Sequence, residues 1–266
     1  MAENFNLVQS MSVSKLKNGN LHSQCYHLST FEEASAWVST DTRELRIIGA
    51  GLEMYRSLHE KTGYSEFPQL VGMEAYVHSG RKIKDKIGPD HPMAQNLLVE
   101  CVKGIIQVES FIYAERGYPD LSSYVDYWCA LNDNTCYTFT HRKDGPSLWS
   151  VNPRDYNLFN RSRVIHGHKN NHKKMLYGTF IDTYHEINIH LTLDPGNVVL
   201  DVSADFIRMP GEICKNSAIR LQDLVGHNLT EMNKQQIRLL IGGSEGCSHL
   251  LEIVNDAIRS MNDSNE

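Results

Sequence analysis

The stretch of the chain that decides its fold runs His185-Glu186-Ile187-Asn188-Ile189-His190-Leu191-Thr192-Leu193-Asp194-Pro195-Gly196-Asn197. Apolar and polar residues alternate along it, which is typical of a strand with one buried and one exposed face. The buried face is predicted to carry His185, Ile187, Ile189, Leu191 and Leu193. Because proline and glycine follow Asp194 where a type II turn needs them, the chain is expected to turn back at that point.

Extended segments on both sides of this strand complete an antiparallel meander. Residues 175–184 precede the strand and residues 198–209 follow the turn, and both have the composition of strands. Three helices are expected next, over about residues 211–225, 232–241 and 247–261, the first with Cys214 on its inward face. This order of strands followed by helices predicts an α+β domain over residues 156–266.

The N-terminal half has a different pattern. Residues 1–20 are polar and are expected to form a flexible arm, while residues 21–155 are predicted to be mainly helical, with helices over 41–61 and 90–116. Asp90 can cap the second helix and Pro92 suits its first turn. The turn-rich segment 143–153 is the expected seam between the halves, and no internal repeat is evident. The predicted fold class is α+β, with a helical N-terminal half followed by an antiparallel β meander packed with C-terminal helices.

The composition excludes several classes of partner. The chain has 266 residues, of which 41% are hydrophobic and 22% charged, and its formal net charge is -6. It lacks the basic stripe of nucleic-acid-binding proteins and the cationic amphipathic helix of membrane-surface proteins. No segment reaches the roughly 20 apolar residues of a membrane span, and the start lacks the apolar core of a secretory signal. We therefore expect a cytoplasmic protein with a small-molecule partner, no nucleic acid and no membrane.

A glycine-rich turn precedes the last predicted helix and places a cysteine and a histidine at its start. The stretch is Ile241-Gly242-Gly243-Ser244-Glu245-Gly246-Cys247-Ser248-His249-Leu250-Leu251-Glu252. Helix N-termini have partial positive charge and free N–H groups, so a thiol placed there ionises more readily. The pattern predicts a reactive Cys247 with His249 as its base. Glu186 or Asp182, beside His190 on the polar face, is a further acid-base candidate.

Several short segments resemble a bacterial domain-of-unknown-function family, number 2889. They are Asp182-Thr183-Tyr184-His185-Glu186-Ile187, Leu191-Thr192-Leu193-Asp194, Arg208-Met209-Pro210 with Cys214, Leu224-Val225-Gly226, and Gly242-Gly243 through Gly246-Cys247-Ser248-His249-Leu250. The resemblance covers about residues 159–261, and residues 1–155 resemble no known family. It implies a shared fold and a shared set of cysteines and histidines, without an activity that transfers.

The family-type positions His185, Cys214, Cys247 and His249 form a candidate metal site. They come from a strand face, a helix face and a helix start that the expected packing would bring together. Two thiolates and two imidazoles fill a tetrahedral zinc shell, or three of them do so with water in the fourth position. Two alternatives stay open: a metal-free cysteine and histidine pair acting as nucleophile and base, or a purely structural role.

A basic, histidine-rich run over residues 161–174 is the candidate substrate-binding segment. Arg161, Arg163 and His168 are the residues expected to receive an anion such as a carboxylate or phosphate. The alternative is a solvated basic loop with no ligand.

Together these features favour a small-molecule metabolic enzyme. We expect a hydrolase or lyase that acts on an anionic substrate, with an aromatic group as an option because residues 113–128 are rich in aromatic side chains. A zinc-like divalent metal is the cofactor that the Cys/His set would hold. The alternative from another class is a non-catalytic ligand- or metal-binding accessory protein.

Overall fold

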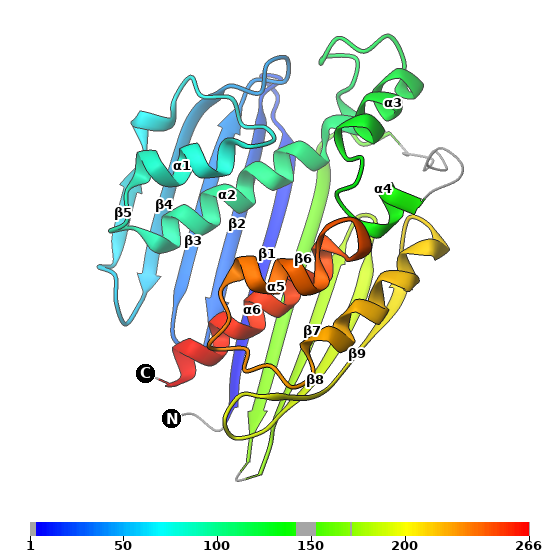
Figure 1. The fold of residues 1–266 in the computed structure, drawn as a ribbon. Coiled ribbons are helices and arrows are strands. Elements are labelled where there is room, and N and C mark those ends of the chain that lie inside the picture. Colours follow the sequence, from blue (N-terminus) through cyan, green and yellow to red (C-terminus); the bar gives the residue numbers. More distant parts are fainter. Residues whose placement is uncertain (1–3, 142–152, 171, 266) are drawn as a thin grey trace. The chain divides into compact units, whose positions relative to one another are not determined.

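The computed structural model describes residues 4–141, 153–170 and 172–265, the side chains of the last two residues excepted. Within these residues the strands are β1 (Asn4–Lys15), β2 (Leu21–Ser29), β3 (Glu33–Thr40), β4 (Ile47–Arg56), β5 (Gly63–Glu66), β6 (Asn157–Lys169), β7 (Lys174–Asp182), β8 (Glu186–Leu193) and β9 (Val199–Arg208). Hydrogen-bonded neighbours follow the order β5-β4-β3-β2-β1-β6-β7-β8-β9 (Figure 1).

The α-helices are α1 (Ser79–Ile87), α2 (Pro92–Gln107), α3 (Leu121–Leu131), α4 (Tyr137–His141), α5 (Lys234–Ile241) and α6 (Ser248–Asn265). Short 3-10 segments are η1 (Pro68–Leu70), η2 (Glu109–Phe111) and η4 (Gly243–Glu245), and a longer one is η3 (Glu212–Leu224). Among the described residues, no helix combines the length and the apolar character that crossing a membrane requires.

The chain divides into two compact units. Unit 1 comprises Met1–Val8, Val125–Trp149 and Ser162–Glu266, and unit 2 comprises Gln9–Tyr124 and Ser150–Arg161. The expected seam at 143–153 falls almost entirely on residues 143–152, which lie outside the described residues.

Unit 2 is an antiparallel meander with a helix packed on its middle strands. The meander runs through β2, β3 and β4, and α2 packs on β2 and β3. The core face of α2 is fully buried and consists of Leu97, Leu98, Cys101 and Ile105. The predicted helix over 90–116 is confirmed in its main part, because α2 starts at Pro92 and is followed by η2.

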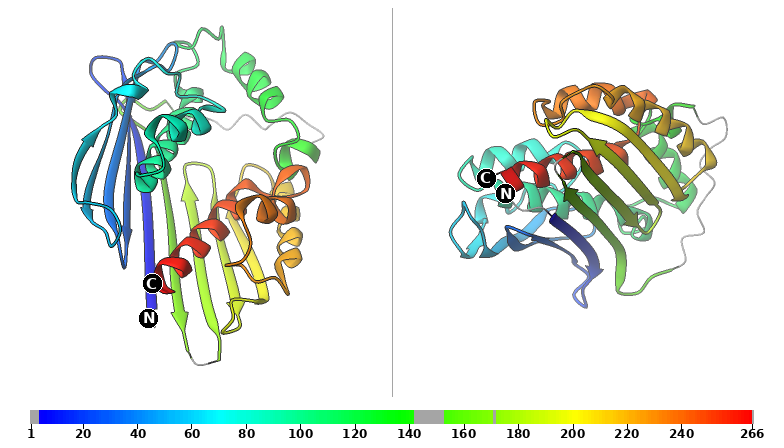
Figure 2. Two further views of the ribbon diagram at one scale, coloured as in Figure 1. Left: turned by 60° about the vertical axis from the view of Figure 1, so that its left-hand side comes forward. Right: turned by 90° about the horizontal axis from the view of Figure 1, so that it is seen from below.

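Unit 1 contains the meander that the sequence predicts. β7, β8 and β9 are antiparallel neighbours, and α6 lies across β7 and β8 (Figure 2). Close approach requires glycine at position 178, where a Cβ atom would stand 2.3 Å from Ile253 of α6. The turn after β8 is not type II, because the positive φ that Gly196 would need is found at Asn197 instead, at 71°.

The expectation of a helical N-terminal half is wrong. Five strands lie between residues 4 and 66, so the expected arm at 1–20 contains β1 and the expected helix at 41–61 contains β4. Along β1 the alternating buried residues are Phe5, Leu7, Gln9, Met11 and Val13. Because the buried set includes a glutamine, the two-residue period is obscured in the sequence. The fold class is therefore α+β with a strand-rich N-terminal half.

Candidate functional site

An aspartate at the end of β7 organises the turn that leads into β8. Oδ1 of Asp182 accepts hydrogen bonds from the backbone N–H groups of Tyr184 and His185, both at 2.7 Å. The same oxygen lies 3.2 Å from Nδ1 of His185. This arrangement is an Asx-type turn, in which a short acidic side chain replaces a backbone carbonyl. It holds a buried carboxylate and an imidazole side by side.

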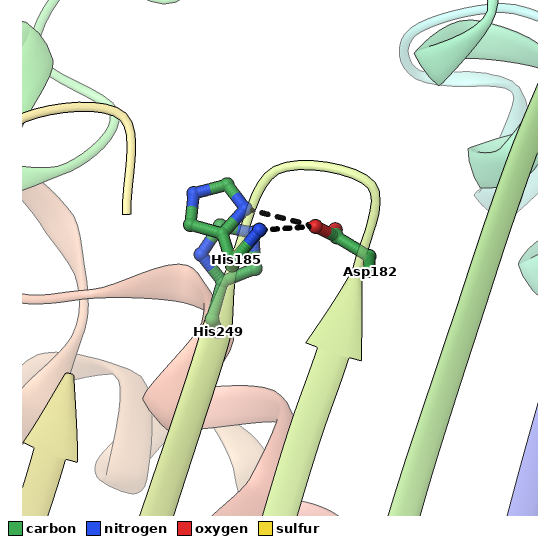
Figure 3. Close-up of side chains that lie close together, drawn as sticks. All are labelled: Asp182, His185 and His249. Atoms are coloured by element: carbon green, nitrogen blue, oxygen red, sulfur yellow. Dashed lines mark hydrogen bonds and ion pairs between the residues drawn. The ribbon is translucent and has the colours of Figure 1, made fainter. Parts of the chain in front are cut away.

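A second histidine comes to this turn from α6. The rings of His185 and His249 have centroids 4.0 Å apart with an interplanar angle of 41°. His249 is the second residue of α6, and its ring also contacts Phe180 of β7, with centroids 4.7 Å apart. Figure 3 shows the two imidazoles together, with the Asp182 carboxylate directed toward them.

These three side chains form a group that could hold a metal ion. One ligand atom each from Asp182, His185 and His249 lies within 4.8 Å of the others. No other such group of histidine, cysteine or acidic residues occurs in the described part of the chain. Ligand atoms around tetrahedral zinc stand about 3.4 Å apart, given Zn–N distances of about 2.1 Å. Small side-chain rotations would therefore suffice to close the group on a cation.

The thiol of Cys247 lies next to this group but is not ionised. Its Sγ is 3.9 Å from Nδ1 of His249, and only 7% of the residue is exposed. Burial raises the pKa of Cys247 to about 12, because a low-dielectric environment disfavours the thiolate more than the nearby backbone N–H groups favour it. The expected lowering of this pKa by the helix start is wrong.

Cys214, the fourth residue of the predicted metal set, faces another element. Its Sγ lies 2.9 Å from Oγ1 of Thr138 in α4. The thiols of Cys136 and Cys214 are close enough to interact electrostatically with that of Cys247, and burial raises the pKa of Cys136 as well. The structure therefore joins His185 and His249 to Asp182 and places Cys214 near the thiols of Cys136 and Cys247.

Glu186, the acid-base candidate, stands at the start of β8. It is opposite Arg208 in the register with β9 and is half-buried. It is not a member of the three-residue group.

The basic run up to residue 169, which includes Arg161, Arg163 and His168, belongs to a strand rather than a loop, since β6 covers residues 157–169. Arg163 is buried and forms ion pairs with two carboxylates of α6, at 2.9 Å to Glu252 and 2.7 Å to Asp256. Arg161 is also buried, with its guanidinium over the ring of Phe159. Nδ1 of His168 lies 2.7 Å from Oδ1 of Asn4. The positive charge of Arg163, which an anionic ligand would need, is thus already paired with two carboxylates of α6.

Sequence reasoning named Asp182 only as an acid-base candidate beside His190 and missed it as a member of the metal set. The sequence signal that could have placed it there is the stretch Asp182-Thr183-Tyr184-His185 at the end of a predicted strand. An aspartate in such a turn commonly accepts hydrogen bonds from the backbone two and three residues later, as Asp182 does.

The fold and the site define an α+β protein with a two-histidine, one-carboxylate cluster. Residues 165–261 match the model of a family described as protein of unknown function (DUF2889), which confirms the resemblance of the C-terminal part. The matched segment includes Asp182, His185 and His249. No curated protein and no solved structure matches the chain.

Proposed function

We propose that Asp182, His185 and His249 bind a divalent metal ion of the zinc type, and that the protein uses it as a small-molecule hydrolase or lyase. The observation behind this proposal is that the three candidate ligand atoms lie within 4.8 Å of one another. Three protein ligands of this kind leave coordination positions for water and substrate, as in catalytic rather than structural zinc sites.

The state of the thiol favours a metal over a cysteine nucleophile. With a pKa of about 12, Cys247 is protonated at neutral pH, and its Sγ stands 3.9 Å from the imidazole that would have to take its proton. The thiolate is the nucleophile, so a neutral thiol does not supply that function. The two imidazoles and the carboxylate need no such ionisation of a thiol.

A divalent ion at this position would supply the chemistry of a hydrolase or lyase. It lowers the pKa of a bound water and polarises a carbonyl or phosphoryl oxygen. Its positive charge also favours an anionic substrate group, so the anionic substrate class no longer depends on the arginines of β6. Asp182 holds the backbone of Tyr184 and His185, and thereby orients the His185 ring.

The test compares metal-free and zinc-loaded protein in the hydrolysis of p-nitrophenyl acetate and p-nitrophenyl phosphate. We expect turnover of at least one probe by the loaded protein, and its loss in His249→Ala. His141→Ala is the matched control, because His141 is an exposed histidine of the same unit that pairs with Glu245. Stoichiometric zinc binding without turnover of either probe would contradict the hydrolase and favour the accessory metal-binding protein.

A further inference from the structure

The turn that carries His185 has a counterpart in unit 2. The segment Ser29-Thr30-Phe31-Glu32-Glu33 joins β2 to β3, as Asp182-Thr183-Tyr184-His185-Glu186 joins β7 to β8. Oγ of Ser29 accepts hydrogen bonds from the backbone N–H groups of Phe31 and Glu32, at 3.2 and 2.8 Å. Asp182 does the same for Tyr184 and His185. In each turn the first residue also donates its N–H to the carbonyl of the fourth.

The likeness extends along the strands that follow. The pairing of β3 with β4 shifts register at Glu33/Ala34 and at Ser39/Thr40. The pairing of β8 with β9 shifts at the equivalent places, Glu186/Ile187 and Thr192/Leu193. The next turn starts with an aspartate in both cases, Asp41 and Asp194, whose side chain accepts backbone N–H groups. The two units therefore repeat one meander-and-helix module, which the sequence alone did not reveal.

An arginine binds the turn in both copies. In unit 1, Nη1 of Arg208 donates to the carbonyl of Thr183 at 2.7 Å, and Nη2 donates to those of Asp182 and His185, at 2.7 and 3.2 Å. In unit 2, Nη1 of Arg56 donates to the carbonyl of Thr30 and Nη2 to that of Ser29, both at 2.8 Å.

The candidate ligands differ between the copies although the arginine does not. Ser29 stands where unit 1 has Asp182, and Glu32 stands where it has His185. The second residue of α2 is Met93, whereas the second residue of α6 is His249. The module in unit 2 thus presents the same turn and the same arginine without the carboxylate and two imidazoles.

We infer that Arg208 is a positioning residue for the metal site of unit 1, an inference that rests on the proposed function. Its guanidinium donates to three carbonyls of the turn and thereby restrains the backbone from Asp182 to His185. This backbone carries the His185 ring, whose centroid lies 4.0 Å from that of the His249 ring. Groups that orient metal ligands without touching the metal commonly change metal affinity by about 10- to 100-fold.

The experiment uses Arg208→Ala, Arg208→Lys and the matched control Arg56→Ala in the full chain. Zinc affinity and melting temperature are measured for each, and the NMR contact (nuclear Overhauser effect) between the rings of His185 and His249 is measured in metal-free protein. We expect both alanine variants to melt earlier than wild type. Only Arg208→Ala should weaken zinc binding, by about 10- to 100-fold, and weaken the contact between the two rings. Arg208→Lys should recover part of both.

The inference fails if folded Arg208→Ala keeps the zinc affinity and the ring contact of wild type, or if Arg56→Ala changes them equally. If Arg208→Ala does not fold, Arg208→Lys decides by the same two measurements. Wild-type protein that binds no zinc would refute the proposed function, and the contact between the rings of His185 and His249 in the metal-free variants would then decide whether Arg208 positions the His185 ring.

Discussion

The rings of His185 and His249 are tilted by 41° with centroids 4.0 Å apart, although one lies in the turn between β7 and β8 and the other in the first turn of α6. Packing of α6 on β7 and β8 brings them together within unit 1. Two imidazoles held this close repel each other when both are protonated, whereas neutral imidazoles can share a cation. The buried carboxylate of Asp182, whose side chain is 1% exposed, completes the set.

The two roles of Asp182 can be separated by substitution. Asp182→Asn keeps an Oδ1 acceptor for the N–H groups of Tyr184 and His185 but removes the negative charge. We expect it to fold with near wild-type stability and to bind zinc at least tenfold more weakly. Asp182→Ala removes the acceptor too, and should lower the free energy of unfolding by about 1–3 kcal/mol. Urea denaturation and zinc titration measure the two effects, and unchanged zinc affinity in Asp182→Asn would exclude the carboxylate as a ligand.

Cys247 should be inert toward alkylation in the folded protein. With a pKa of about 12, about one thiol in ten thousand is ionised at pH 8, against roughly a tenth for a thiol with the ordinary pKa of 9.0. Native labelling by iodoacetamide, read by mass spectrometry, should therefore be about a thousandfold slower than in urea. Rapid labelling of native Cys247 at pH 7 would contradict its burial.

The raised pKa of Cys247 also predicts how the stability of the fold changes with pH. The ordinary pKa of 9.0 applies to the unfolded chain, and the folded value is about 12. Between these values the unfolded thiol loses its proton first, so stability is full below pH 9 and falls as pH rises toward 12. Cys247→Ala should flatten this fall.

Arg163 should matter for stability rather than for ligand binding. Its side chain is 5% exposed and pairs with Glu252 and Asp256. Removing one partner of a buried ion pair costs about 3–5 kcal/mol, because the remaining charges stay buried. Arg163→Ala should melt at a markedly lower temperature. The control Arg81→Ala removes an exposed guanidinium, 92% accessible and 3.9 Å from Asp85, and should shift the free energy of unfolding by less than about 0.5 kcal/mol. Equal melting of the two variants would contradict the ion pairs.

Two glycine-to-alanine substitutions should have opposite effects. A Cβ at position 178 would stand 2.3 Å from Ile253 and 2.6 Å from Ile189, so Gly178→Ala should destabilise unit 1 by about 1–3 kcal/mol. Gly80 lies in α1, and its nearest contact would be Val99 at an ordinary 3.4 Å. Gly80→Ala should stabilise the helix by about 0.5–1 kcal/mol. Chemical denaturation distinguishes the two signs, and a stabilised Gly178→Ala would contradict the close packing of α6.

The meander of unit 1 was predictable from sequence because its buried positions are apolar. In β8 the buried residues are Ile187, Ile189, Leu191 and Leu193. In β4 the pattern is less clear, since Gly49 and Gly51 are placed against the ring of Trp37 in the neighbouring strand. Such a cross-strand contact depends on register, which periodicity within one segment does not reveal.

The candidate site was predictable only in part. His185 and His249 were assigned to one metal set, and the structure places them together. Asp182 was named as an acid-base candidate but was left out of the metal set, because its proximity to His185 follows from a turn geometry and not from a periodic face. The ionisation of Cys247 depends on how deeply the surrounding elements bury it, and a helix start alone does not determine that.

Zinc binding by metal-free protein is the measurement that tests the central claim most directly. Isothermal titration of wild type should show one zinc ion per chain, since unit 2 offers serine, glutamate and methionine at the corresponding positions. His249→Ala should lose this binding, and His141→Ala should retain it. Wild-type protein that takes up no zinc, or His249→Ala protein that binds it as tightly as wild type, would contradict a metal site at Asp182, His185 and His249.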